Sequence, residues 1–357
     1  MHGTVTIVGA GILGATLAHQ LVSAGWQVTV IDQHPPGSML GSSGGVSRLS
    51  RFVHGDNRAD ALAAWESLSL WRQIEVDTGT KLMTQTGLVW LAGDDDRWEQ
   101  AGHRILREIG VPVELMPVEQ AGSLFPDLFT DDLRYLLYEP EAALIRAQAA
   151  LRALIGDAIR RGASFRRARA TRDGSAVLVD GRRLTADHVV WAVGCWTAEV
   201  FPELLRASVI QQDTYYFAAP AEWSSPAVPA WSEFPAGITG SGSLDGTGMK
   251  VGLHEPGPAV ALDGTRAVDP KLEAHARAFV RRRFPALASA RIVRSEVQHT
   301  AKVDWVDGIE PSFSTGGVRF TRDPEHASVW ILGDGSGSVF KTAPVVAATA
   351  ASTLQGV

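Results

Sequence analysis

Three glycines near the start of the chain have the spacing of a turn that binds a nucleotide phosphate. Gly9, Gly11 and Gly14 form a Gly-x-Gly-x-x-Gly motif between the β-branched residues 4–8 and an apolar-periodic stretch. In such a turn the first glycine allows tight reversal, the second lets backbone approach a pyrophosphate, and the third permits close packing of helix on strand. Asp32 ends the next β-branched run, where its carboxylate can accept ribose hydroxyls. We therefore predict a dinucleotide-binding βαβ unit; a purely structural glycine turn is the alternative.

A glycine- and serine-rich stretch, residues 41–45, follows Asp32 where a nicotinamide-binding domain would continue its parallel repeat. Flexible backbone amides followed by Arg48 suit an extended cofactor whose phosphates and ring are wrapped by several loops. This favours FAD over a nicotinamide cofactor, with a solvated surface loop as the alternative. Arg51 follows Arg48 at a spacing of three, which on a helical turn would place both guanidiniums on one side, ready for a carboxylate or phosphate.

A strand pattern in residues 248–254 separates two chemically different faces. With a period of two, the apolar side chains would face a core, and the other face would carry Gly248, Lys250, Gly252 and His254. Two missing side chains would leave room for a flat ring, and one cation would point at it. An exposed strand face is the alternative.

Near the C-terminus, the run Gly-Asp-Gly-Ser-Gly-Ser at residues 333–338 follows an apolar strand. It precedes Phe340, Lys341 and a helix expected to start at Pro344. Helix N-terminal amides and the lysine would favour an anion or an electron-rich ring at this point.

The elements that must position these residues are helices and strands in alternation. Apolar periodicity predicts helices after the first glycine turn and at 60–77, 95–110, 146–161, 270–283 and 344–354. β-branched and alternating runs predict strands at 4–8 and 27–31, and near 87–92, 134–138, 188–193, 209–217, 249–254, 292–302 and 328–333.

Two of the later strands, at 188–193 and 329–332, are short apolar runs that are each followed by a glycine. This pattern is typical of buried parallel strands that lead into ligand-binding loops. We therefore predict an α/β fold with a discontinuous, Rossmann-like FAD-binding domain made of residues 1–80, 146–209 and 320–357. Residues 81–145 and 210–319 would form a second, mostly antiparallel β domain that binds the substrate.

Composition excludes several classes of protein. The 357 residues carry 33 Lys and Arg against 39 Asp and Glu, a formal charge of −6, so there is no basic excess for a nucleic acid partner. One cysteine, Cys195, excludes an internal disulfide and a cysteine-based zinc site, and no histidine pair has metal-ligand spacing. No secretory signal or long apolar run is visible, so we expect a cytoplasmic protein without a membrane segment, a monomer or weak dimer, and no metal. The run Arg281 to Arg283 is interpreted as a solvated helix end.

Taken together, these motifs resemble the FAD-dependent D-amino acid oxidase superfamily, and within it the branch of monomeric sarcosine oxidase and N-methyltryptophan oxidase. The resemblance spans nearly the whole chain. It depends on the glycine motif with Asp32, the Ser/Gly loop ending in the two arginines, the Gly-x-Lys-x-Gly-x-His strand, and the Ser-Gly-x-x-Phe-Lys segment at 336–341.

By this resemblance, Arg51 and Lys341 look like the pair that binds the substrate carboxylate. Lys250 looks like the lysine that activates oxygen, and His254 like an active-site histidine beside the substrate amine. The residues expected at the cofactor are Gly9, Gly11, Ile12, Gly14, Asp32, Gln33, Ser42, Ser43, Gly44, Arg48, Gly194, Trp196, Gly335, Gly337, Ser338, Phe340 and Lys341.

The sequence departs from its sarcosine-oxidising relatives in three places. Gln298 or His299 stands where these relatives attach the flavin to a cysteine, so FAD should be bound without a covalent bond. Residues 237–242, Gly-Ile-Thr-Gly-Ser-Gly, stand where the relatives carry tyrosines that wall the substrate, which favours a larger or more polar amine than sarcosine. Ser338-Val339 replaces the usual His-Gly, which alters contacts near the flavin ring. Cys195 itself is interpreted as a packing residue.

The resulting hypothesis is an FAD-dependent oxidase of a C–N bond in an amino or imino acid with a free carboxylate. Hydride would pass to flavin N5, and O2 would reoxidise the flavin to give H2O2 and an imine. An NAD-dependent dehydrogenase and a non-catalytic flavin-binding protein are the alternatives.

Overall fold

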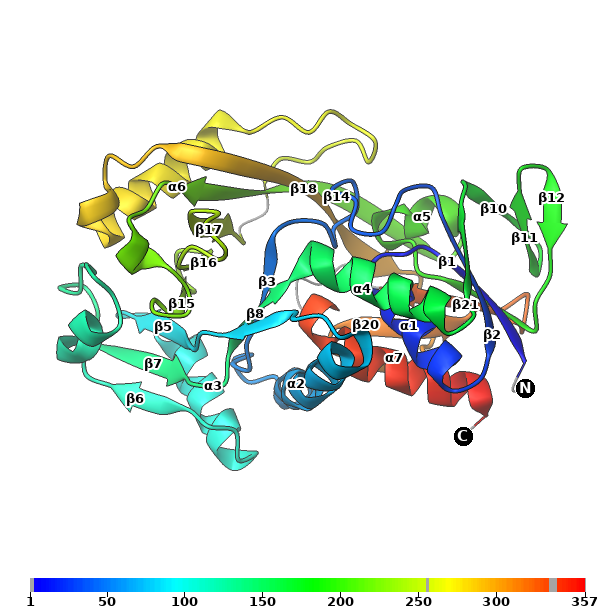
Figure 1. Cartoon of the computed structure of the whole chain (residues 1–357), viewed down its shortest axis with the longest axis horizontal. Coiled ribbons are helices and arrows are strands. Elements are labelled where there is room, and N and C mark those ends of the chain that lie inside the picture. Colours follow the sequence, from blue (N-terminus) through cyan, green and yellow to red (C-terminus); the bar gives the residue numbers. More distant parts are fainter. Residues whose placement is uncertain (1–2, 255–256, 334–338, 357) are drawn as a thin grey trace.

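The computed structural model describes residues 3–254, 257–333 and 339–356, and two large sheets dominate it (Figure 1). The first sheet has seven strands in the order β19-β20-β21-β13-β1-β2-β9. The strands from β21 to β9 are mutually parallel, and β20 and β19 extend the sheet in antiparallel fashion. Its strands are β1 (Thr4–Val8), β2 (Gln27–Asp32), β9 (Ser164–Arg167), β13 (His188–Trp191), β19 (Phe313–Thr315), β20 (Val318–Arg322) and β21 (Val329–Gly333).

Both faces of this parallel sheet are covered, which explains why its strands are apolar on both sides. One face is covered by helices α1 (Ile12–Ser23), α2 (Arg58–Thr78), α4 (Ala147–Arg160) and α7 (Val339–Gln355), of which α1 contacts both α4 and α7. The other face packs on β10 (Ala170–Asp173), β11 (Ala176–Val179), β12 (Arg182–Leu184) and the residues around α5 (Thr197–Val200). In β1, Val5 and Ile7 pack in the core under the helices, and Val8 packs in the core on the opposite face.

The second sheet has eight strands in the order β18-β14-β17-β16-β15-β5-β7-β6, and all neighbours are antiparallel except β15 and β5. Long strands β14 and β18 reach from this sheet toward the parallel one across the top of Figure 1. Its strands are β5 (Leu88–Ala92), β6 (Glu114–Met116), β7 (Tyr135–Glu139), β14 (Leu205–Phe217), β15 (Ala230–Glu233), β16 (Ile238–Ser241), β17 (Met249–Leu253) and β18 (Ile292–Trp305). Helix α6 (Pro270–Arg283) packs on one face of it.

A third, small sheet joins the two parts of the molecule. It contains β3 (Ser47–Ser50), β8 (Ala143–Arg146) and β4 (Met83–Gln85). Helix α3 (Arg97–Glu108) lies beside α2. The remaining elements are short 3₁₀ turns at Val118–Ser123, Gly194–Trp196, Ala221–Trp223 and Pro285–Leu287.

The predicted α/β class is confirmed, as are all the predicted helices and the longer strands, with altered ends. Helix α7 differs most: it already includes Val339, so Pro344 lies inside the helix rather than at its start, where it removes one i to i−4 hydrogen bond. The division into two domains stays a prediction. Strand β19, which that division places in the segment 210–319 of the substrate domain, pairs with β20 in the seven-stranded sheet.

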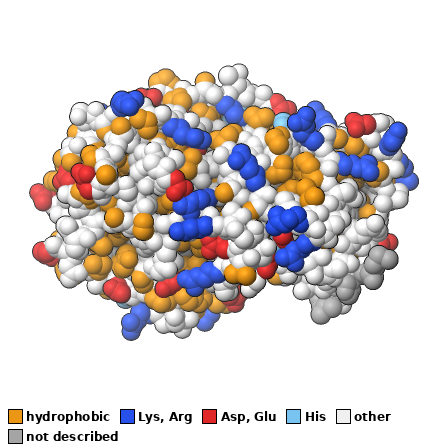
Figure 2. Space-filling view, viewed as in Figure 1, with side chains coloured by type: hydrophobic (Ala, Val, Ile, Leu, Met, Phe, Trp, Pro, Cys, Tyr) orange, Lys and Arg blue, Asp and Glu red, His pale blue; other side chains and the backbone are white. Residues whose placement is uncertain are grey.

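The surface in Figure 2 mixes charges of both signs. Lys and Arg side chains lie mainly across the middle and right of this face, with Asp and Glu among them, and hydrophobic side chains are scattered over the left. In the part of the chain that the structure describes, no helix is both long and apolar enough to cross a membrane.

In the arginine run at the end of α6, Arg281 and Arg282 are exposed as predicted, whereas Arg283 is fully buried. The Arg283 guanidinium donates to Glu233 at 2.9 Å, to Asp132 at 2.7 Å and to the carbonyl of Phe129 at 2.6 Å. The prediction was wrong for Arg283 because these acceptors are distant in sequence. The pair of carboxylates and the arginine tie α6 to β15 and to the loop before β7.

Replacing Arg283 with Met should therefore lower the free energy of unfolding by about 1.5–3 kcal/mol, since it removes the buried guanidinium from Glu233 and from the Phe129 carbonyl, while Arg282 still pairs with Glu233 and Asp132. Urea denaturation followed by circular dichroism measures this change. Arg281→Ala on the exposed side of the same helical turn is the matched control, with an expected change within about 0.5 kcal/mol. Equal effects of the two substitutions would contradict the structural role of Arg283.

Candidate active site

A cavity of about 560 Å³ lies where the carboxyl ends of the parallel strands meet one face of the eight-stranded sheet. In open α/β sheets, ligands bind in the crevice outside these strand ends. The cavity wall includes the β1–α1 turn, the end of β2, loop residues 41–43, residues 191–197 after β13, and parts of β14, β17 and β18. Segments from the beginning, middle and end of the chain therefore form one site.

The β1–α1 turn approaches the backbone of the next strand so closely that side chains are excluded from it. A Cβ at Gly9 would lie 2.3 Å from the carbonyl oxygen of Ala192, and one at Gly14 would lie 1.9 Å from the carbonyl oxygen of Gly9. Gly14 therefore serves helix–strand packing and is not on the cavity wall. Gly11 is, and a Cβ there would meet only Ser43 Oγ, at 3.3 Å. This geometry fits the roles predicted for the three glycines: tight reversal at Gly9, backbone approach to a pyrophosphate at Gly11, and helix–strand packing at Gly14.

Asp32 closes the turn from the neighbouring strand. Its carboxylate accepts hydrogen bonds from the amide of Ala10 at 2.6 Å and from the amide of His34 at 2.7 Å. Asp32 and Gln33 both lie on the cavity wall. At the start of α1, the amide of Ile12 donates to Ser43 Oγ at 3.0 Å, which joins the helix terminus to the serine-rich loop.

Arg48 shapes that loop from inside the protein. It lies in strand β3, and its guanidinium donates to the carbonyls of Ser42 and Gly44 and to Gln298 Oε1. Burial lowers the pKa of this arginine, while Glu296 raises it. The Gly44 carbonyl also accepts from Gln298 Nε2 at 2.9 Å, so Gly44 supports the loop and is not on the cavity wall.

The expectation that Arg48 and Arg51 share one side of a helical turn is wrong, since β3 is a strand. Arg51 lies beyond its end, with its guanidinium 5.3 Å from the ring centroid of Trp90 and donating to the Val53 carbonyl. Buried Glu139 accepts from Trp90 Nε1 at 2.6 Å and from the amide of Phe52 at 2.5 Å. No pattern in the sequence predicts a role for Glu139, because only the fold brings β7 to this loop.

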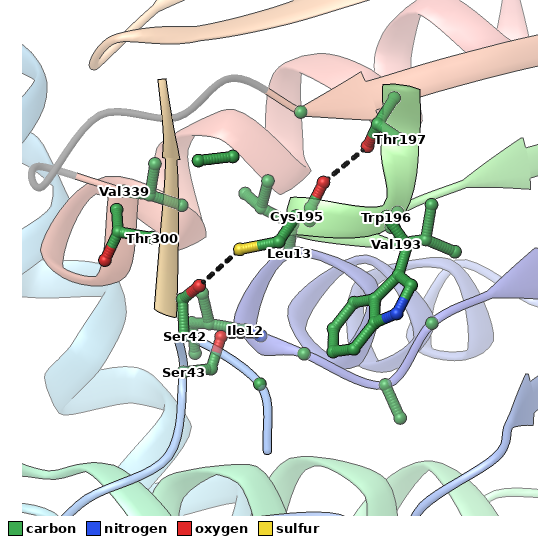
Figure 3. A pocket seen from close by; sticks show the side chains of 18 of the residues that line it. Ile12, Leu13, Ser42, Ser43, Val193, Cys195, Trp196, Thr197, Thr300 and Val339 are labelled. Atoms are coloured by element: carbon green, nitrogen blue, oxygen red, sulfur yellow. Dashed lines mark hydrogen bonds between the residues drawn. The ribbon is translucent and has the colours of Figure 1, made fainter. Parts of the chain in front are cut away.

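Residues 193–197 form the part of the wall that adjoins the serine loop, and Figure 3 shows the two segments in contact. Gly194 and Trp196 lie on this wall. Cys195 does too, and its Sγ is 3.0 Å from Ser42 Oγ, so it bridges two cavity segments besides packing (Figure 3). Trp196 Nε1 donates to Asp263 at 3.3 Å.

The predicted two faces of strand β17 are confirmed for the residues inside the strand. Met249, Val251 and Leu253 join the core under α6, while Lys250, Gly252 and His254 lie on the cavity wall. The register aligns β17 with β14 and β18, so the same face also presents Gln212 and Thr214 from β14 and Gln298 and Thr300 from β18. Gly248 is different: a Cβ there would lie 2.7 Å from the Phe217 carbonyl, so it leaves no room for a ring.

Lys250 and His254 carry strongly shifted pKa values. Lys250 Nζ donates to the carbonyl of Ser47 at 2.7 Å, and burial together with Arg48 lowers its pKa to about 7, against the opposing effect of Glu296. His254 Nε2 lies 2.9 Å from Thr239 Oγ1. Burial and the charges of Arg51, Lys250 and Lys341 lower the pKa of His254 to about 4, so its imidazole is neutral near pH 7.

Arg51 and Lys341 are brought close to His254, although neither lies on the cavity wall. Burial and Arg51 lower the pKa of Lys341 well below its usual range, while Asp60 and Glu139 raise it. Lys341 lies in the first turn of α7, next to Phe340, which is on the cavity wall and stacks on Trp71 at 5.9 Å. Gly335, Gly337 and Ser338 lie outside the described residues.

Two departures in sequence can be placed in the structure. In β16, Thr239 lies on the cavity wall, and no aromatic side chain of residues 237–242 is available to wall it. In β18, Gln298 lies on the cavity wall, whereas His299 is buried and its Nδ1 is 3.1 Å from the carbonyl of Leu262. Within residues 3–254, 257–333 and 339–356, no group of three His, Cys, Asp or Glu side chains could hold a metal ion.

Comparison with known proteins agrees with this geometry. Residues 4–353 match the model of the DAO family, described as FAD dependent oxidoreductase. The chain is 25% identical to monomeric sarcosine oxidase of Bacillus sp. (strain B-0618), over 95% of this chain and 89% of that protein. It is 24% identical to N-methyl-L-tryptophan oxidase of Yersinia pestis (strain Pestoides F), over 73% of this chain and 72% of that protein.

Among solved structures, L-proline dehydrogenase from P. horikoshii superimposes with a TM-score of 0.83 at 20% identity, covering 98% of this chain and 92% of that one. At this identity the likeness concerns the fold alone. The resemblance predicted from the motifs is confirmed at the level of the family.

The place of Gly11 on the cavity wall leads to a prediction that separates folding from dinucleotide binding. A Cβ there would meet only the Ser43 hydroxyl, at 3.3 Å, and φ −65° and ψ −177° suit any residue, so Gly11→Ala should lower the free energy of unfolding of the apoprotein by no more than about 1 kcal/mol. The added methyl group would occupy the space through which backbone approaches a pyrophosphate, so we expect the Kd for FAD to rise at least about tenfold. Fluorescence titration of apoprotein measures the Kd.

Gly122→Ala is the control, since nothing lies within 4 Å of a Cβ there and Gly122 is not on the cavity wall. An unchanged Kd in Gly11→Ala would contradict the placement of the dinucleotide at this turn.

Proposed function

The chain belongs to the DAO family of FAD-dependent oxidoreductases, and from this premise we propose that it oxidises a C–N bond in an amino or imino acid that carries a carboxylate. The observation that supports this proposal is a cavity whose wall carries Lys250 and the neutral His254, with Arg51 and Lys341 close to His254 behind that wall. A buried excess of positive charge beside a flavin site favours an anionic substrate group.

The residues present fit an FAD molecule. The open Gly11, the amides at the start of α1, and Asp32 at the end of β2 provide the surroundings that pyrophosphate and ribose require. No acidic residue occupies the first turn of α1, so nothing there repels the phosphates. At the other end of the cavity, Lys250, Gly252 and Phe340 line a space that a flat ring can enter. Family membership excludes the alternative of an NAD-dependent dehydrogenase.

We further propose that FAD is held without a covalent bond. Gln298 faces the cavity at the strand position of the expected flavin link, and an amide is not a nucleophile for such a bond. The Cys195 thiol lies next to Ser42 on the serine-loop side, and burial raises its pKa, which keeps it protonated.

The carboxylate of the substrate would bind to Arg51 and Lys341. Two carboxylates act on both cations: Glu139, which is fully buried, and Asp60. Binding at a fixed cation pair would orient the C–H bond of the substrate, which is the main contribution a protein makes to such a reaction.

A bound FAD would accept a hydride from the carbon next to the nitrogen and pass two electrons to O2, which with two protons becomes H2O2. His254 is neutral and would add no positive charge beside the substrate amine. Lys250 would supply positive charge where oxygen takes up electrons, a preorganised electrostatic effect.

The substrate is proposed to be larger or more polar than sarcosine. Thr239 and His254 form a hydrogen-bonded pair on the wall, and Thr214 lies beside Gly252 in the same region. This part of the wall holds hydroxyl groups rather than aromatic rings. It can accommodate additional substrate atoms and form hydrogen bonds with them.

Anaerobic mixing with a panel of amino and imino acids tests the proposed function. We expect the yellow holoenzyme to lose its absorbance near 450 nm with at least one carboxylate-bearing amine, and to release H2O2 when air is admitted. Bleaching by no member of the panel would favour the alternative of a non-catalytic flavin protein. Acid precipitation of the same preparation should leave the pigment in the supernatant; pigment in the pellet would contradict non-covalent binding.

Lys250→Met should separate the two half-reactions. Removing the cation should slow reoxidation of the reduced enzyme by O2 by roughly 100-fold or more, while the rate of reduction by substrate changes little. Stopped-flow absorbance measures both rates. Lys250→Arg is the matched control, because it keeps the charge and should retain a larger share of the reoxidation rate. Equal slowing of both half-reactions in Lys250→Met would refute the role given to Lys250.

A further inference from the structure

Glu296 is a buried carboxylate that the proposed reaction does not use. It is 3% exposed and projects from β18 beside the lysine end of the cavity. Its Oε1 accepts from the amide of Val46 at 3.2 Å and from Arg294 at 2.8 Å, and its Oε2 accepts from Tyr216 Oη at 3.1 Å. These contacts fix the carboxylate from three different elements.

The strand register puts Glu296 and Lys250 on one face of the eight-stranded sheet. Tyr216 of β14 is paired with Lys250 of β17, and Thr214 of β14 is paired with Glu296 of β18. Strand β14 therefore separates the two residues, and their backbones are roughly 12 Å apart, with both side chains directed to the same side. Tyr216 lies directly opposite Lys250, and its hydroxyl donates a hydrogen bond to Glu296.

A second connection passes through strand β3. Lys250 Nζ donates to the carbonyl oxygen of Ser47 at 2.7 Å and lies 3.3 Å from Ser47 Oγ, while Glu296 holds the amide of the preceding residue, Val46. A Cβ at Gly45 would lie 2.8 Å from Glu296 Oε2, so the loop fits closely over the carboxylate. The carboxylate thus holds the backbone segment that in turn holds the ammonium group.

We propose that Glu296 is the positioning residue of Lys250: it fixes the backbone at the start of β3, whose Ser47 carbonyl binds the ammonium group, and it places a carboxylate on the same sheet face as the lysine. The proposal rests on the role assigned to Lys250 under the proposed function. It extends that role to a carboxylate on another strand.

The charged groups around Lys250 define the sign of the effect. Arg48 faces it from β3, Glu296 and Arg294 from β18, Tyr216 from β14, and His254 from its own strand β17. Burial and Arg48 lower the pKa of Lys250 to about 7, and Glu296 is the group that raises it. Removing the negative charge of Glu296 must therefore shift the loss of the lysine proton to lower pH.

The experiment compares Glu296→Gln with wild type in the FAD-bound full-length protein. One measurement is competitive labelling of Lys250 with trace acetic anhydride across pH, quantified by mass spectrometry, which reports the pKa of the amine without any turnover. The second is the pH dependence of reoxidation by O2 in the stopped-flow instrument. We expect both midpoints to fall by on the order of one pH unit in Glu296→Gln, with the rate of reduction by substrate nearly unchanged.

Two further variants control for packing. Glu296→Asp keeps the charge and should keep both midpoints near those of wild type. Arg294→Gln removes a half-exposed cation beside the carboxylate and should raise the labelling midpoint, the opposite direction to Glu296→Gln. Because Arg294 is half-exposed, this variant decides the question even where Glu296→Gln does not retain FAD: a midpoint that falls or does not move would overturn the proposal.

The outcomes distinguish this inference from the proposed function. If Lys250→Met slows reoxidation but Glu296→Gln leaves both midpoints of Lys250 in place, Glu296 has a structural role only and the inference is wrong. If Lys250→Met leaves reoxidation intact, the role of Lys250 itself is wrong, whatever the labelling midpoint in Glu296→Gln.

Discussion

The burial of cations around a single cavity is the constraint on which the rest of the structure depends. Arg48, Arg51, Lys250 and Lys341 are all removed from bulk water, and each has its pKa lowered by burial. A buried charge is tolerated only when it has fixed partners. Much of the irregular backbone in this region exists to provide them: the carbonyls of the serine loop for Arg48, the Ser47 carbonyl for Lys250, and the loop after β3 for Arg51.

Carboxylates divide these cations into two groups. Glu139 and Asp60 act on Arg51 and Lys341, whereas Glu296 acts on Arg48 and Lys250. The first group is the one assigned to the substrate carboxylate, and the second lies at the lysine assigned to oxygen. The small sheet β3-β8-β4 joins both, since Arg48 lies in β3 and Arg51 directly follows it. Arg48 and Arg51, which the spacing of three predicted to lie on one side of a helical turn, are thus directed to different partners because β3 is a strand.

What the sequence could predict depended on local periodicity. The glycine turn with Asp32 follows from the glycine spacing between a β-branched run and a stretch of helical periodicity. The two faces of β17 follow from a period of two, and both features appear in the structure as expected. Long-range partners had no such signal. Glu139 and Glu296 look like ordinary strand residues until the sheets assemble around Arg51 and Lys250, and Arg283 looked solvated until Glu233 and Asp132 were placed beside it. The start of α7 was missed because Pro344 is usually a first-turn residue, yet here it lies within the helix.

The wall of the cavity shows why family membership does not determine the substrate. The cofactor end is built from backbone: close approach at Gly9 and Gly14, amides of α1, and carbonyls around Arg48. Such a framework accepts many side-chain changes without moving. The proposed substrate end is built from side chains on one sheet face, Thr239, Thr214 and His254, and exchanging them leaves the register of the sheet intact. In the proposed site the cofactor framework and the substrate wall therefore reside on different physical elements, and the second can diverge while the first is kept.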